Sequence, residues 1–267
     1  MKKLGLGILI AVVALALSGA AAAIPNQAAD VAKEKAKTPD LEKIEFIHWK
    51  KGFAKPPCNN DGICDPEENP SCADCKKNGE EEEPTATCYA FLGQYGKRLL
   101  KWGDLPVSYV INPTNLDELS ETFVASAISA GAEEWDYWTG VELFNGYSFG
   151  GTQARVQDYI NTLAWGNYPT AGVIAVATVW YNPATKTIVE FDIMFDTDWT
   201  WGDATVNSAV MDLQNIATHE LGHGVGLADV YETECSAVTM YGYSDYGETQ
   251  KRTLETPDII GIQTLYK

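Results

Sequence analysis

Alternating apolar and polar residues predict three β-strands in the later part of the chain. Residues 106–111 (PVSYVI) alternate and are rich in β-formers. Residues 172–182 (GVIAVATVWYN) form a longer apolar run with many β-branched side chains. In residues 188–196 (IVEFDIMFD) the odd-numbered side chains are apolar and face one way, whereas the even-numbered ones, mostly acidic, face the other. These segments therefore predict a sheet.

Apolar residues at three- and four-residue spacing predict helices around these strands. One helix covers residues 115–138, and Gly140 ends it. A second runs from about residue 206 to 225. A short final helix follows Thr256 as its N-cap, with Pro257 at the first helical position. Strands and helices in this order predict an α+β domain.

The chain before this domain has a different composition. Residues 1–23 begin with MKK, continue as an apolar run and end in small residues with A-x-A spacing, which is typical of a secretory signal peptide. An uncleaved membrane anchor is the alternative, because the run approaches spanning length. Residues 24–57, rich in Ala, Lys, Glu and Pro, predict a linker or pro-segment, residues 58–88 a small cysteine-rich module with an acidic tether, and residues 89–267 the α+β domain.

The cysteines indicate an oxidising compartment. Five of the six lie between Cys58 and Cys88, and Cys235 stands alone near the end. Cys72 and Cys75 have the spacing of a zinc knuckle, but an exported chain oxidises its thiols, so a disulfide module is favoured. We therefore expect a secreted protein, or one held at the cell surface if residues 1–23 are not cleaved.

The charge of the chain limits its partners. The formal net charge is −18, and removal of a signal peptide containing Lys2 and Lys3 makes it −20. Such a surface repels nucleic acid, whose binding depends on neutralising phosphates. No later segment is long and apolar enough to span a bilayer, so we expect no stable membrane insertion once the signal is cleaved. Protein or peptide partners, and a monomeric chain, are expected.

The stretch HELGHGVGLAD, residues 219–229, carries the candidate chemistry. Residues four apart stack on one helix face, so His219 and His223 can present both imidazoles to one metal ion. Glu220 lies one position round the helix, where it can take a proton from a zinc-activated water. Gly226 lets the chain leave the helix through a left-handed turn, so Asp229 can return to the metal as a third ligand.

These residues resemble the zinc signature of the metzincin metallopeptidases, H-E-x-x-H-x-x-G-x-x-H, with Asp229 in place of the last histidine, as in snapalysin-type members. Met240 in AVTMYGY is similar to the methionine of the turn beneath the metal in that clan. The tail LETPDIIGIQTLY resembles the matrixin (M10-type) ending. Residues 172–182 and 188–196 resemble the edge strand and its neighbour in the same domain. The resemblance covers roughly residues 100–267.

The resemblance implies a zincin-like catalytic domain: a twisted mixed sheet packed on an active-site helix, followed by a C-terminal helix. His219, His223 and Asp229 would bind Zn²⁺, Glu220 would be the general base, and Met240 would form an apolar floor. The edge strand would pair with an extended substrate, unless neighbouring strands already pair with it on both sides. The implied function is a secreted zinc metalloendopeptidase. The alternatives are a non-catalytic, zinc-stabilised extracellular binding protein on the same scaffold, or a fortuitous HExxH in an unrelated exported domain.

Four weaker expectations complete the prediction. Cys235 is expected to pair with Cys88. Cys58, in KPPC, faintly resembles the inhibitory cysteine of matrixin pro-segments, although a disulfide is favoured there. His48 is expected at the surface. A Ca²⁺ site formed by carboxylates of the acidic loop is considered, but their spacing matches no calcium loop and a solvated loop is favoured. These carboxylates are Asp192, Asp196, Asp198 and Asp203.

Overall fold

The computed structural model describes residues 40–53, 87–93 and 99–267. The described residues belong to one unit, which extends from Asp40 to Lys267. The predicted signal peptide (residues 1–23) and the inhibitory role considered for Cys58 lie outside the described residues, as does most of the cysteine-rich module.

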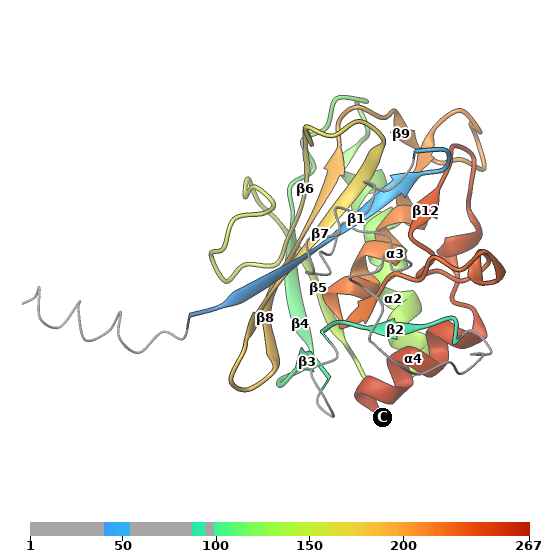
Figure 1. Cartoon of the computed structure of the whole chain (residues 1–267). Coiled ribbons are helices and arrows are strands. Elements are labelled where there is room, and N and C mark those ends of the chain that lie inside the picture. Colours follow the sequence, from blue (N-terminus) through green and yellow to red (C-terminus); the bar gives the residue numbers. More distant parts are fainter. Residues whose placement is uncertain (1–39, 54–86, 94–98) are drawn as a thin grey trace, which may run out of the picture. The chain divides into compact units, whose positions relative to one another are not determined.

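A mixed sheet of eight strands forms one layer of this unit (Figure 1). Its strands are β1 (Glu42–Lys50), β3 (Lys101–Trp102), β4 (Val107–Ile111), β5 (Phe144–Phe149), β6 (Thr162–Gly166), β7 (Val173–Asn182), β8 (Thr187–Asp196) and β12 (Tyr243–Ser244). The order is β12-β1-β7-β8-β6-β4-β5, with β3 beside β8. The strands β5, β4, β6 and β8 run parallel, whereas β7 is antiparallel to both β8 and β1.

The three predicted strands are confirmed as β4, β7 and β8. The alternation in β8 did not mark a solvent-facing side, because its even-numbered residues, including Asp192, are also buried. The sequence pattern did not predict β5, most of which is exposed, or the short strand β6. Each contributes only one large apolar side chain to the main core cluster, Phe144 from β5 and Leu163 from β6, so their own apolar pattern is weak.

The helices cover one face of the sheet. They are α2 (Glu121–Thr139), α3 (Leu213–Gly224) and α4 (Thr256–Tyr266). The helices α2 and α3 begin later than predicted, and α4 begins close to its predicted start. In each case a capping side chain sets the first residue of the helix. Ser120 accepts a hydrogen bond from the N–H of Phe123, and Asp212 accepts one from Asn215. For α4 the N-cap is Glu255 rather than Thr256.

Short elements connect these layers. Two small two-stranded sheets pair β9 with β10 and β2 with β11. Two 3₁₀ turns lie in the segments between α3 and α4. The bounds are β2 (Ala90–Phe91), β9 (Trp201–Gly202), β10 (Met211–Asp212), β11 (Leu227–Ala228), η1 (Thr233–Cys235) and η2 (Gln250–Arg252).

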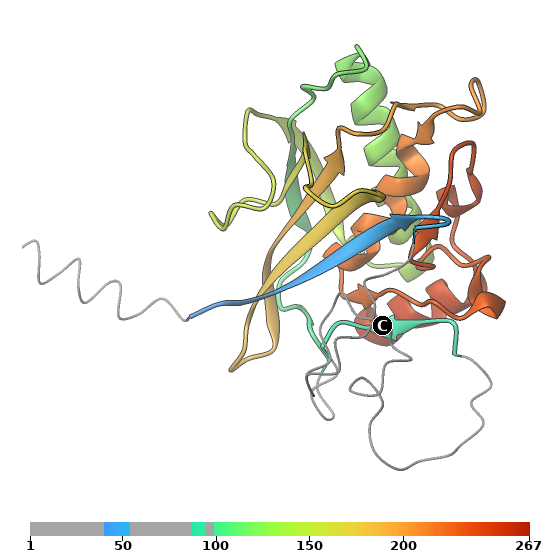
Figure 2. The ribbon, with the colours of Figure 1, turned by 45° about the horizontal axis from the view of Figure 1, so that its top comes forward.

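Within the segment predicted as a linker or pro-segment, residues 42–50 form a strand that the sequence did not predict. This segment is β1, which lies antiparallel to β7 along its length and parallel to β12 at its end. Both views show β1 running along the sheet beside the chain that carries β12 (Figures 1 and 2). Its sequence, EKIEFIHWK, is rich in β-formers, but apolar residues on both faces hide the alternation.

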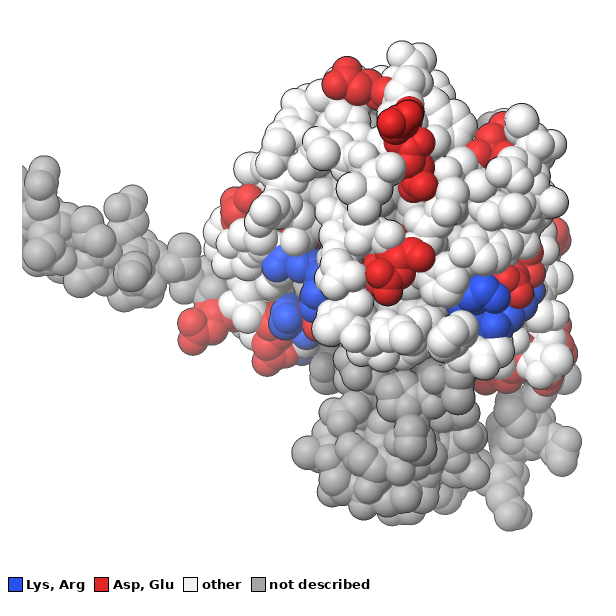
Figure 3. Space-filling model, turned by 90° about the horizontal axis from the view of Figure 1, so that it is seen from above, with Lys and Arg blue, Asp and Glu red and all other residues white. Residues whose placement is uncertain are grey.

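The acidic composition of the chain is visible on its surface. On the face shown in Figure 3, acidic side chains are scattered among uncharged ones, with a few basic groups beside them. Within the described ranges, no helix has the length and apolar character needed to cross a membrane.

Candidate metal and catalytic centre

The helix α3 places two imidazoles side by side. His219 and His223 lie one turn apart, with ring centroids separated by 4.8 Å, and both side chains are buried. The Nδ1 of His219 faces the carbonyl oxygen of Thr239 at 2.6 Å, and the Nδ1 of His223 faces that of Leu227 at 2.8 Å. A carbonyl only accepts, so each Nδ1 carries the proton and each Nε2 presents a lone pair.

A turn after α3 brings Asp229 to the same point. Gly226 has φ of +111°, and a Cβ there would lie 2.8 Å from the carbonyl oxygen of Leu100, so only glycine fits. The chain then forms β11 and returns to the helix. The Oδ1 of Asp229 lies 3.1 Å from Nε2 of His219 and 3.5 Å from Nε2 of His223. The sequence-predicted ligand set is therefore brought together.

These three ligand atoms fit a metal ion. They lie within 4.8 Å of one another, and all are buried without a hydrogen-bond partner among the described residues. Two lone pairs and a carboxylate oxygen repel one another unless a cation lies between them. Two nitrogens and one oxygen are a donor set found at catalytic zinc, where the fourth position is taken by water or substrate.

The ionisation of the cluster agrees with this need for positive charge. Burial lowers the pKa of His219 to about 4. Burial also opposes ionisation of His223, but the Asp229 carboxylate outweighs it and raises the pKa of that imidazole. In turn, although burial acts in the opposite direction, the imidazole of His223 holds the pKa of Asp229 well below its usual range.

Glu220 lies beside the ligands without joining them. Its Oε1 is 3.9 Å from Nε2 of His219, and its buried Oε2 has no hydrogen-bond partner among the described residues. Burial raises the pKa of Glu220 to about 8. A carboxyl group poised near neutrality beside a metal site is suited to take up and release a proton.

The prediction that His48 is a surface residue is wrong. His48 is only 1% exposed, and its Nδ1 lies 2.9 Å from Oε1 of Glu220. Its ring lies against that of His219, with centroids 4.0 Å apart. His48, His219 and Glu220 form a second group with converging ligand atoms. Both ring nitrogens of His48 already have protein partners, however, so the group containing Asp229 is the better metal site.

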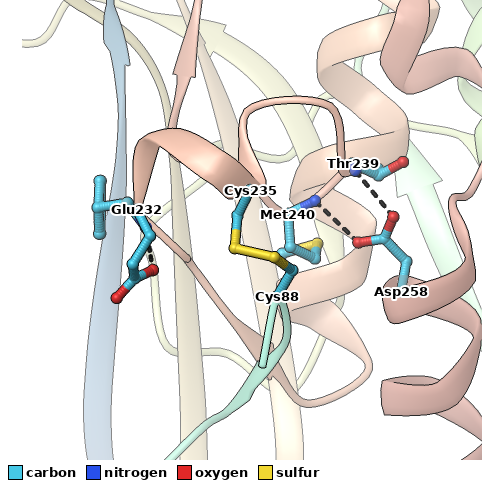
Figure 4. Close-up of a disulfide and its surroundings, with 7 residues drawn as sticks. Cys88, Glu232, Cys235, Thr239, Met240 and Asp258 are labelled. Carbon is cyan, nitrogen blue, oxygen red and sulfur yellow. Dashed lines mark hydrogen bonds between the residues drawn. A yellow bond between two sulfur atoms is a disulfide. The ribbon is translucent and has the colours of Figure 1, made fainter. Parts of the chain in front are cut away.

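Met240 lies under the helix that carries the ligands. It is fully buried, and a Cβ on Gly222 would collide with its Sδ. Asp258 holds the turn by accepting hydrogen bonds from the N–H groups of Thr239 and Met240, at 2.8 and 3.1 Å (Figure 4). Because the carbonyl of Thr239 faces Nδ1 of His219, this turn also fixes the orientation of that ring.

The expected disulfide between Cys88 and Cys235 is present (Figure 4). It joins the segment before β2 to η1, in the chain between Asp229 and the Met240 turn. Because β2 also pairs with β11, the start of the domain is attached on both sides of Asp229.

Tyr231 is a site residue that the sequence did not reveal. Its hydroxyl donates a hydrogen bond of 2.8 Å to Oδ2 of Asp229, leaving Oδ1 to face the histidines. Burial raises the pKa of Tyr231 well above its usual value, so the hydroxyl keeps its proton. In the sequence, the only feature that could have indicated this role is that Tyr231 lies two residues after Asp229.

The aspartates considered as calcium ligands do not converge. Asp192 accepts backbone hydrogen bonds from Val156 and Thr162, and Asp203 pairs with Arg252. Asp196 accepts hydrogen bonds from the backbone N–H groups of Tyr168 and Asp198. The groups of converging ligand atoms found among the described residues include none of these four carboxylates.

Comparison with known proteins gives consistent matches. The family model for matrixins (Peptidase M10) matches residues 101–267. The chain is 30% identical to neutrophil collagenase of Homo sapiens over 166 residues, which are 62% of this chain and 33% of the collagenase. It is 29% identical to matrix metalloproteinase-27 of Homo sapiens over 178 residues, 66% of this chain and 32% of that protein. The matched region thus spans about a third of each relative.

Proposed function

The chain belongs to the matrixin family, and we propose that it is a secreted zinc-dependent metalloendopeptidase that hydrolyses peptide bonds in proteins. The observation that carries the proposal is the position of Glu220 beside three converging, partnerless ligand atoms. An ion site alone has no chemical need for a buried carboxyl group at its side.

The residues divide the chemistry among them. His219, His223 and Asp229 would hold zinc, which supplies an acidified water and polarises a carbonyl group. Glu220 takes the proton of the attacking water and passes it to the leaving amine. Tyr231 and the carbonyls facing the two histidines keep the ligand atoms oriented.

The sheet supplies the place for a substrate. β1 lies antiparallel to β7 and parallel to β12, and its side chains reach the ligands. Phe46 stacks on His223 with centroids 4.2 Å apart, and His48 lies on His219. A peptide in place of β1 would pair through its backbone with β7, which is sequence-independent binding and suits an endopeptidase.

This placement implies that the form with β1 in the sheet is latent. His219, Glu220 and His223 are each 0% exposed while β1 is in place. A protein substrate therefore reaches Glu220 only after β1 has been cut away or has left β7. Residues 42–50 thus act as an inhibitory segment, which blocks access to the site by pairing as a strand with β7.

The proposal is tested on the full chain after β1 has been dislodged. Because N–H groups point alternately to the two sides of a strand, the double variant Phe46→Pro/Ile47→Pro removes one that faces β7. We expect this variant to cleave a denatured protein at least roughly 10-fold faster than the unaltered chain. Adding Glu220→Gln should lower that rate by roughly 100-fold or more.

Glu133→Gln, at an exposed position on α2, is the matched control and should change nothing. Cleavage that survives Glu220→Gln would contradict the mechanism. The observation that β1 fills the site in this structure favours the alternative function, a non-catalytic zinc-stabilised binding protein. That alternative predicts a dislodged chain that binds zinc and cleaves nothing.

A further inference from the structure

The side chain of His48 occupies a polar position beside the candidate general base. Its Nδ1 lies 2.9 Å from Oε1 of Glu220, and its Nε2 lies 2.9 Å from Oγ of Ser244 and 3.1 Å from Nζ of Lys251. Because the ammonium group of Lys251 can only donate, Nε2 of His48 is the acceptor and Nδ1 carries the proton that faces Glu220. The position thus offers a buried amine to whatever side chain enters it.

Lys251 is fully buried, which is rare for a lysine. Its Nζ donates to the carbonyl oxygens of Tyr241 and Tyr243 and faces Nε2 of His48. An ammonium group has three donors, so two are used by the backbone and the third is directed at His48. When β1 leaves, that third donor needs another acceptor or remains buried and unsatisfied.

A bound substrate would send a side chain to this position. Side chains alternate along a strand, so Phe46 and His48 both face α3 while Ile47 faces away. Phe46 lies on His223 and His48 on His219, so the backbone between them crosses the ligand cluster. In an extended peptide bound like β1, the residue in the place of His48 therefore flanks the cleaved bond.

We propose that Lys251 determines specificity, by favouring substrates that place a neutral hydrogen-bond acceptor, such as the amide of Asn or Gln, in the position of His48. This inference rests on the proposed peptidase function. An aliphatic side chain would leave the third donor of Lys251 without a partner, and a site built for a hydrogen bond rejects such analogues. A carboxylate would lie beside the carboxyl group of Glu220 and oppose its ionisation.

The same geometry explains why His48 suits an inhibitory strand. Its imidazole satisfies Lys251 through Nε2 and at the same time engages Glu220 through Nδ1. An occupant that engages the base in this way opposes its own hydrolysis.

The test compares two peptides copied from residues 42–50, with Asn or Leu in place of His48. These two side chains have nearly the same shape, so the hydrogen bond is the main difference. With the full-length Phe46→Pro/Ile47→Pro chain, we expect kcat/KM to be roughly 10- to 100-fold higher for the Asn peptide. Lys251→Met should remove or reverse the preference for the Asn peptide, and Lys251→Arg should retain part of it. A lysine that served only to support the backbone would lower both rates equally.

Binding gives a readout independent of cleavage. Calorimetry on the full-length chain carrying Phe46→Pro, Ile47→Pro and Glu220→Gln should show tighter binding of the Asn peptide. Equal affinities or preference for Leu would overturn the inference, even if Lys251→Met does not fold. A chain that shows the binding preference but cleaves neither peptide refutes the proposed peptidase and leaves the recognition by Lys251 established.

Discussion

Each candidate ligand side chain in the buried centre is held by a hydrogen bond through its other polar atom, which does not join the cluster. Carbonyl oxygens hold the Nδ1 atoms of His219 and His223, and Tyr231 holds Oδ2 of Asp229. Such supporting hydrogen bonds fix ring orientation and ligand basicity. Asp229 has a short side chain on a turn, so it depends most on its support.

We therefore predict that Tyr231→Phe weakens zinc binding by roughly 10-fold or more, because Oδ2 of Asp229 loses its donor. The measurement is a chelator-competition titration of the full chain. Tyr147→Phe, at a 43% exposed tyrosine in β5, is the matched control and should leave the affinity unchanged. Equal affinities in the Tyr231 variant and the unaltered chain would contradict the role given to this hydroxyl.

The sequence predicted those site residues whose relation is local. The spacing of His219, Glu220 and His223 is a property of one helix, and Gly226 signals the turn that follows. His48 and Lys251 were not predicted, because 172 residues separate His48 from Glu220 and 203 separate it from Lys251. Only the pairing of β1 in the sheet brings them together.

Among the elements, β4, β7 and β8 were predicted to within one residue at each end, whereas the starts of α2 and α3 were not. The strand β7 is buried on both faces, so its apolar run is unmistakable. The start of α3 was placed seven residues too early, because the cap at Asp212 is set by a local hydrogen bond, not by the apolar pattern. β1 was missed because its strand character appears only beside its partners β7 and β12.

The disulfide should contribute to stability because it joins residues 147 positions apart. Replacing Cys88 and Cys235 together with alanine should lower the free energy of unfolding by roughly 2–4 kcal/mol. Urea denaturation of the unaltered chain and of the double variant measures this difference. The m-values of the two proteins show whether their unfolded states are comparable. Unchanged stability would mean that the pairing of β2 with β11 already suffices to attach this segment.

For the molecule as a whole, the order of the elements and the resemblance to the matrixins gave the α+β fold, and the family match over residues 101–267 supports it. The sequence did not reveal that the unit containing the matched region also includes the strand β1. That difference changes the account of function, because the additional strand fills the site. In the proposed peptidase, β1 would be an occupant of the site that the chain itself supplies.

The central claim is that His219, His223 and Asp229 hold zinc beside Glu220. The most direct test is the zinc content of the full chain after dialysis against metal-free buffer, measured by elemental analysis. We predict one zinc per chain, lost in His219→Ala and in Asp229→Ala, and retained in the control Asp198→Asn. A chain without zinc, or zinc that persists after both ligand substitutions, would contradict the account.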